Sequence, residues 1–363
     1  MEVLERARAI ERQGARVIHL EVGEPDFPAP PEAVEACRQA LARGETGYTD
    51  SRGILELREA IADEHARRSG RPVGAERVLV ANGTSPALFL ALAALLDAGD
   101  EVILATPHYA AYPNIVRAAG GVPVPVLTRA ERGHRLDPEA VARAVTPRTR
   151  AVLLNSPSNP TGAVQPREVV AKLAELGPAL ISDEIYAGLV YGGAEACSAL
   201  SLSDGAFVLD GFSKRFAMTG FRVGYVIAPP EALRALQSLA QNLFISASPF
   251  SQRAALAALE HGAPAAEEMR RALESRRAQL LDGLRGLGFE LPAAPEGAFY
   301  LLADARRFDV DSRRLAFRLL EEGHVAVAPG IDFGEAGEGH LRFSYTASPR
   351  DIDEALTRLR KLL

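Results

Sequence analysis

Short apolar runs alternate with amphipathic stretches between residues 77 and 228. The runs predict strands at 77–81, 101–105, 122–127, 150–154, 179–181, 206–209 and 223–227. Helices are expected between them, near 86–97 and 110–119 and from residues 137 and 166 onward. This alternation is typical of an α/β domain with a largely parallel sheet and right-handed crossovers.

The pattern changes after residue 230. Helical periodicity covers 230–240, 248–261 and 265–286, and strands at 298–302, 325–327 and 341–345 then alternate with helices at 311–322 and 349–362. We therefore expect a second, smaller α+β domain. The predicted division is 1–35 for an N-terminal arm and part of the small domain, 36–265 for the large domain and 266–363 for the small domain.

Composition and charge limit the classes of partner. The 363 residues carry a net charge of −6 without a basic cluster, so neither a nucleic acid nor a membrane is an expected partner. The longest apolar run, 87–96, is too short for a membrane span, which needs about 20 residues. The charged first residues do not form a signal-peptide pattern, and Cys37 and Cys197 are expected to be reduced thiols, so the predicted location is cytoplasmic.

Lysine is rare in this chain: Lys172, Lys214 and Lys361 are its only primary amine side chains. Lys214 lies among apolar neighbours, whereas the other two lie in polar helices. A desolvated lysine has a lowered pKa and can form a Schiff base. The alternative is a salt-bridged lysine at a strand end.

Three further polar positions follow or precede predicted strands. The segment 82–85 leads from a strand into a helix, where backbone N–H groups bind an anion or where the residues simply cap the helix. Arg222, expected to be buried, would pair with a phosphate or with an internal carboxylate. Asp183 would hold a protonated ring nitrogen or cap a turn. Together with Lys214, these are the groups that pyridoxal 5′-phosphate (PLP) requires.

At these positions the chain resembles the class I/II aminotransferases of PLP fold type I, and the resemblance covers nearly its whole length. The matching segments are Asn155-Ser156-Pro157-Ser158-Asn159-Pro160-Thr161-Gly162, Asp183-Glu184-Ile185-Tyr186, Ser213-Lys214 with Gly220–Tyr225, and the stretches 20–27, 48–53 and 341–344. The resemblance implies a large domain with a mainly parallel seven-stranded sheet between helices.

It also implies a role for each residue around the cofactor ring. Lys214 would hold PLP as the internal aldimine and then shuttle the proton at the substrate Cα. Asp183 would keep the pyridine nitrogen protonated, Tyr186 and Asn159 would hydrogen-bond the ring hydroxyl oxygen, and Tyr109 would stack on the ring.

The phosphate and the substrate would have their own ligands. The residues implied for the phosphate are Gly83, Thr84, Ser85, Arg222 and, from the neighbouring subunit of a homodimer, Tyr48. Arg342 would pair with the substrate α-carboxylate, helped by Asn159 and the backbone of Gly23. The implied reaction is ping-pong transfer of an amino group from an L-amino acid to a 2-oxo acid.

The chain departs from the family pattern in three places. Gly211 stands where members often carry a phosphate-binding serine, so either one phosphate hydrogen bond is missing or Ser213 substitutes for it. The N-terminal segment is expected to be short, with weaker closure. No second arginine for a side-chain carboxylate is evident, which favours neutral or aromatic donors.

Other activities are alternatives to the aminotransferase. A PLP-dependent C–S (beta) lyase would use the same lysine, aspartate and tyrosine. A PLP-fold regulator would need room for a DNA-binding domain. An NAD-dependent enzyme or a P-loop ATPase would need a glycine motif after a strand, which the sequence lacks.

Overall fold

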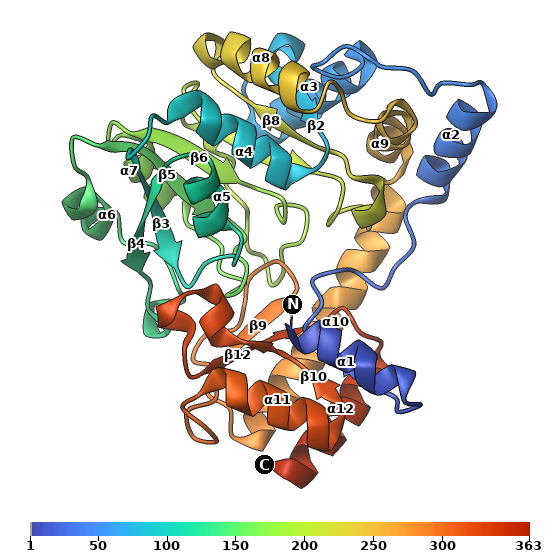
Figure 1. Ribbon diagram of the computed structural model, residues 1–363, viewed down its shortest axis with the longest axis vertical. Coiled ribbons are helices and arrows are strands. Elements are labelled where there is room, and N and C mark those ends of the chain that lie inside the picture. Colours follow the sequence, from blue (N-terminus) through green and yellow to red (C-terminus); the bar gives the residue numbers. More distant parts are fainter. Residues whose placement is uncertain (1) are drawn as a thin grey trace.

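The computed structural model of the chain describes residues 2–363 and contains a seven-stranded sheet in the order β2-β8-β7-β6-β5-β3-β4 (Figure 1). β8 is antiparallel to both its neighbours, and the other pairs are parallel. The strands are β2 (Val78–Ala81), β3 (Glu101–Thr106), β4 (Val122–Leu127), β5 (Thr149–Asn155), β6 (Ala179–Asp183), β7 (Phe207–Gly211) and β8 (Gly224–Ile227). The predicted largely parallel sheet is confirmed.

Helices cover both faces of this sheet, because alternate residues of each strand are buried in different cores. Leu79 packs with α4 (Thr84–Leu95), α5 (Tyr112–Ala118) and α8 (Leu233–Leu243). Its neighbours Val78 and Val80 face the opposite core. That core is formed with α3 (Leu55–Ser69), α6 (Pro138–Ala144), α7 (Arg167–Ala174) and α9 (Pro249–His261), and α2 (Pro31–Ala42) packs on α9.

A separate core lies in the lower part of Figure 1. It combines an antiparallel sheet in the order β11-β12-β9 with a two-stranded parallel sheet of β1 and β10. The elements are α1 (Glu2–Arg12), β1 (Ile18–His19), α10 (Ala263–Leu287), β9 (Tyr300–Asp304), α11 (Ser312–Gly323), β10 (Val325–Ala326), β11 (Ala328–Pro329), β12 (His340–Ser344) and α12 (Pro349–Leu362). The N-terminal residues therefore fold with the C-terminal third of the chain.

One predicted strand differs in the structure, and one confirmed strand has an unusual composition. The predicted strand 325–327 is split, because β10 pairs with β1 whereas β11 pairs with β12 in the other sheet. β4 is mostly exposed and contains Pro123 and Pro125, which are tolerated because β4 is the last strand of its sheet.

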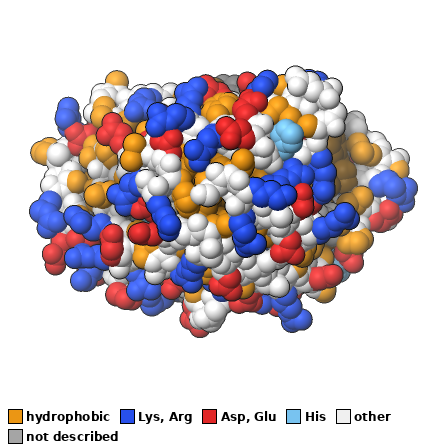
Figure 2. Space-filling model, turned by 90° about the horizontal axis from the view of Figure 1, so that it is seen from below, with side chains coloured by type: hydrophobic (Ala, Val, Ile, Leu, Met, Phe, Trp, Pro, Cys, Tyr) orange, Lys and Arg blue, Asp and Glu red, His pale blue; other side chains and the backbone are white. Residues whose placement is uncertain are grey.

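The face seen from below in Figure 2 mixes acidic and basic side chains without a region of one sign. Exposed ion pairs join α1 and α11 of the lower core, as in Arg313 with Glu2 and Arg6 with Glu321. Between residues 2 and 363, none of the helices has the length and apolar character that crossing a membrane requires.

Candidate active site

The polar loops selected from the sequence follow strands of the large sheet at its carboxyl edge, where ligands of parallel sheets bind. Segment 82–85 follows β2, Tyr109 follows β3, Asn159 follows β5, Tyr186 follows β6 and Lys214 follows β7. Because these strands run side by side, residues far apart in sequence meet at one edge.

These loops and the lower core enclose a cavity of about 630 Å³. All the predicted site residues except two line it: Gly23, Thr84, Ser85, Tyr109, Asn159, Asp183, Tyr186, Ser213, Lys214, Arg222 and Arg342. The exceptions are Gly83, directly behind the wall, and Tyr48, which is 82% exposed on the surface. The fold thus brings the predicted residues together, with the exception of Tyr48.

Lys214 is positioned as a desolvated amine. Its Nζ donates a hydrogen bond to the carbonyl oxygen of Gly23 at 2.7 Å and lies 5.8 Å from the ring centre of Phe299. Burial lowers the pKa of Lys214 to about 8. The exposed Lys172 and Lys361 are far from this environment, so the sequence-based choice among the three lysines agrees with the structure.

Asp183 is a buried carboxylate at the end of β6. Its Oδ2 accepts a hydrogen bond from the hydroxyl of Tyr112 at 2.7 Å, and its Oδ1 accepts one from the amide of Ile185 at 3.2 Å. Burial raises the pKa of Asp183 to about 6, against the effect of these two bonds. Such a carboxylate is suited to pair with a buried cation. The contact with Tyr112 could not be predicted from local sequence patterns, because it joins positions 71 residues apart.

The start of α4 forms a narrow cradle with the segment 222–224. A Cβ on Gly83, whose φ is +110°, would lie 2.5 Å from Nη2 of Arg222, and a Cβ on Gly224 would lie 2.6 Å from the amide nitrogen of Thr84. Only glycine permits this approach at both positions. The first-turn N–H groups of α4 and the guanidinium of Arg222 thereby border one anion-sized space.

Arg222 itself is exposed, and the expectation of a buried arginine was wrong. The backbone of Arg222 is left-handed, with φ 55°, at the end of the turn Thr219–Phe221. Its side chain therefore leaves the direction of strand β8, while Val223 and Tyr225 stay in the core. Its Nη1 donates to the carbonyl of Thr219 at 2.8 Å.

The glycine at position 211 is explained by packing. A Cβ there would lie 3.0 Å from both Cα of Gly224 and Oγ1 of Thr84. A serine at this position would crowd the contact between β7, β8 and the start of α4. Ser213, two residues on, is buried and lines the cavity.

Arg342 of β12 approaches the cavity from the lower core. Its guanidinium stacks over the rings of Tyr300 at 4.3 Å and Phe333 at 4.7 Å. Nη1 donates to Oδ1 of Asn159 at 3.0 Å, Nη2 donates to the carbonyl of Glu21, and the buried Nε has no partner among the described residues. A fixed guanidinium with a free donor matches a carboxylate ligand.

The aromatic residues complete the walls. The hydroxyl groups of Tyr186 and Tyr300 are 3.1 Å apart, and burial raises the pKa of both phenols, so they stay protonated. Tyr109 packs edge-on against Tyr112 with ring centres 5.4 Å apart. From the sequence alone, Tyr300 could not be distinguished from an ordinary core residue of the strand predicted at 298–302.

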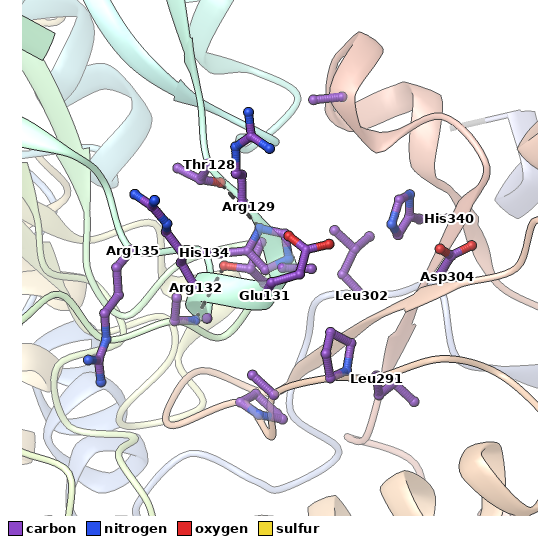
Figure 3. Close-up of a pocket in the computed structure, with 18 of the residues that line it drawn as sticks. Thr128, Arg129, Glu131, Arg132, His134, Arg135, Leu291, Leu302, Asp304 and His340 are labelled. Atoms are coloured by element: carbon purple, nitrogen blue, oxygen red, sulfur yellow. Dashed lines mark hydrogen bonds between the residues drawn. The ribbon is translucent and has the colours of Figure 1, made fainter. Parts of the chain in front are cut away.

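A second cavity, of about 870 Å³, lies between the segments 127–137 and 290–296 (Figure 3). Two ion pairs lie in its wall, Arg135 with Glu296 at 3.4 Å and Arg306 with Asp304. Burial lowers the pKa of His134 to about 4, so this imidazole is neutral. The cavity contains none of the predicted site residues.

Comparison with known proteins identifies relatives along the whole chain. A chain from Thermus thermophilus called aspartate/prephenate aminotransferase is 44% identical over 99% of this chain and 94% of its own length. An arginine–pyruvate transaminase from Pseudomonas aeruginosa is 39% identical over 98% of this chain and 92% of its own. The solved structure of the Thermus thermophilus aspartate aminotransferase with maleate superposes with a TM-score of 0.95 at 43% identity, covering 100% of this chain and 96% of that chain.

These findings agree with the transaminase interpretation, and nothing in them favours the C–S lyase. The family model described as aminotransferase class I and II matches residues 15–359. The chain therefore belongs to the class I and II aminotransferases, which use PLP to move an amino group from an amino acid to a 2-oxo acid.

Proposed function

We propose that this chain binds PLP in the 630 Å³ cavity through Lys214 and transfers amino groups there by a ping-pong mechanism. The observation that carries the proposal is the convergence of one desolvated lysine, one buried aspartate and one stacked arginine on a single cavity. Lys214 is the only lysine that lines it. The orphaned Nε of Arg342 and the glycine cradle at Gly83 support the binding of two anionic groups by these walls.

The residues would divide the work by chemistry. Asp183 would pair with the ring nitrogen, Tyr186 and Asn159 would hydrogen-bond the ring oxygen, and Tyr109 would stack on the ring. Thr84, Ser85, Ser213, Arg222 and the amides after Gly83 would take the phosphate. When bound, PLP supplies an electron sink for the bonds at the donor Cα.

Arg342 would hold the donor α-carboxylate, with Asn159 and the backbone of Gly23 beside it. Nζ of Lys214 would then take the proton from the donor Cα and return it to a neighbouring carbon, which its lowered pKa permits near neutral pH. Because Arg342 and Lys214 come from different cores, substrate would bridge them and exclude water from the reacting atoms.

Three features of the whole protein belong to this proposal. Tyr48, exposed on the single chain, would reach the phosphate site of a second copy in a homodimer. A division into a large and a small domain, with boundaries proposed at residues 35 and 265, is supported by the separate cores, although Ala33 and Ala266 pack in the core of the large domain. A cytoplasmic location is supported by the two free, unpaired thiols Cys37 and Cys197.

The test is the absorption spectrum of the protein purified with PLP. We expect a yellow protein that a suitable amino acid bleaches and that pyruvate or 2-oxoglutarate restores. Lys214→Ala should abolish covalent fixation of PLP by borohydride, whereas the control Lys172→Ala should retain it. Equal fixation in both variants would refute the assignment of Lys214. Pyruvate and ammonia accumulating without bleaching would indicate a lyase.

A further inference from the structure

Two charged residues of the cavity wall remain without a role in the proposed function. Lys214, Arg222, Asp183 and Arg342 are assigned to the cofactor and to the α-carboxylate. The remaining charged lining residues are Glu21 and Asp332, both of them acids, beside a set of apolar residues: Val3, Leu4, Val22 and Phe333. The space left for the donor side chain is therefore apolar along its walls and negative in charge.

Glu21 is the more informative of the two acids. It is 8% exposed, and its Oε1 accepts a hydrogen bond from Nδ1 of His19 at 2.7 Å. Its Oε2 is buried and has no partner among residues 2–363. A buried charged oxygen without a partner is costly, so a ligand N–H at this position would be stabilising.

His19 does not neutralise the negative charge fully. Its Nε2 lies 3.1 Å from Oε1 of Glu11, so one imidazole bridges two carboxylates. The hydrogen bond that His19 donates to Glu21 raises the pKa of His19 to about 9, which makes the ring a cation at neutral pH. One cation between two carboxylates leaves this group with a net charge of about −1.

Glu21 also lies next to the proposed α-carboxylate site, because its own carbonyl oxygen accepts a hydrogen bond from Nη2 of Arg342. A donor held by Arg342 therefore begins beside the backbone of Glu21. Its side chain can extend along Val3 and Leu4 of α1, which line the cavity together with Glu21.

We infer that the preferred amino donor carries a positively charged group at the end of an apolar stem, as arginine and lysine do, and that Glu21 binds this group. The inference rests on the proposed function and names its substrate class. A neutral donor would leave Oε2 of Glu21 unpaired. A dicarboxylic donor would face Glu21 and Asp332, and every cation that the described part of the cavity offers is already assigned.

The first experiment measures half-reactions of the PLP-loaded enzyme with arginine, norleucine and aspartate. We expect kcat/KM to fall in that order. Glu21→Gln keeps the shape and an acceptor for His19 but removes the charge, and it should lower the arginine-to-norleucine ratio at least about tenfold. Glu11→Gln is the matched control, because Glu11 also contacts His19 but does not line the cavity, and it should keep the ratio within about twofold.

Binding without reaction gives an independent readout. Calorimetry with 5-guanidinopentanoate and pentanoate compares a charged and an uncharged acid that lack the amino group. The guanidino acid should bind at least about tenfold more tightly to the wild type, and Glu21→Gln should remove most of this difference.

The outcomes separate this inference from the proposed function. If no amino acid changes the spectrum of the loaded protein, the proposed function fails. If neutral donors react but arginine is no better than norleucine, or if aspartate is the best donor, only the present inference is overturned. The inference is also overturned if Glu21→Gln and Glu11→Gln lower kcat/KM equally for all donors, since Glu21 would then act only on the structure.

Discussion

A buried ion cluster adjoins the strand ends that carry the site, and removing its cation tests how the site is supported. Arg68 of α3 contacts Oε2 of Glu184 at 2.9 Å and Oδ2 of Asp210 at 3.1 Å. Glu184 follows Asp183 at the end of β6, and Asp210 precedes Gly211 at the end of β7. One arginine thus ties together the two strand ends that carry Asp183 and Lys214.

We expect Arg68→Met to lower the free energy of unfolding by about 3–5 kcal/mol, because it leaves two buried carboxylates without their cation. The side chains of Glu184 and Asp210 are only 1% and 10% exposed. Arg67→Met on the same helix is the control. Arg67 is 72% exposed and contacts Glu64 at 3.0 Å, so its loss should cost about 1 kcal/mol or less.

The assay is urea unfolding of the PLP-loaded protein, followed by far-ultraviolet circular dichroism because the chain has no tryptophan. Burial already raises the pKa of Glu184 and of Asp210, and Arg68 opposes that shift. Without Arg68 the folded state binds these protons more readily than the unfolded state, so the variant regains stability as the pH falls. The deficit should be larger at pH 8 than at pH 5.5. A deficit below about 1 kcal/mol at both pH values, equal to that of Arg67→Met, would refute the reasoning.

Three further predictions follow from contacts of the site. Arg342→Ala should raise the KM for the amino acid about 100-fold while the absorbance of bound PLP is retained, and an unchanged KM would contradict its assignment. The His19→Gln variant should be less stable than the wild type chiefly at low pH. The pKa of His19 in the folded state, about 9, exceeds the ordinary 6.5. The stabilisation of the folded state by protonated His19, up to about 3 kcal/mol, is therefore complete below pH 6.5 and disappears as the pH rises through 9. Unfolding midpoints at pH 6 and 9.5 measure this stabilisation, and an equal loss of stability at both pH values would contradict the prediction. Tyr112→Phe removes the 2.7 Å bond to Asp183 and should weaken PLP binding by about 1–3 kcal/mol in equilibrium dialysis, whereas undiminished affinity would mean that Tyr112 does not position Asp183.

Sequence patterns predicted the parts of the site that depend on local rules. Strand ends of a parallel sheet share an edge, and this rule alone places segment 82–85, Asp183 and Lys214 together. The desolvation of Lys214 followed from its apolar neighbours. The exposure of Arg222 did not follow from its neighbours, because a left-handed backbone at one residue redirects a side chain without changing the hydrophobic pattern.

Long-range contacts left no local signal. Arg68 occupies an ordinary polar position of α3, and its partners are 116 and 142 residues away. Tyr300 is one aromatic residue of an apolar strand, yet it stacks under Arg342 and contacts Tyr186. Such residues become recognisable only once the strands are placed relative to one another.

Glu21 shows why a short strand can hide a specificity residue. Ile18 and Leu20 are 3% and 0% exposed and belong to the lower core, whereas the side chains of His19, at the end of β1, and Glu21, just beyond it, are hydrogen-bonded to each other on another side. That side is covered by α1, which supplies Glu11 to the imidazole and Val3 and Leu4 to the cavity. The pairing is anchored by β10 and by the amide of Ser344, which donates to the carbonyl of Leu20. A carboxylate placed there by residues more than 300 positions away is held next to Arg342 by the fold itself. Donor selectivity therefore depends on how the first twenty residues dock on the last eighty.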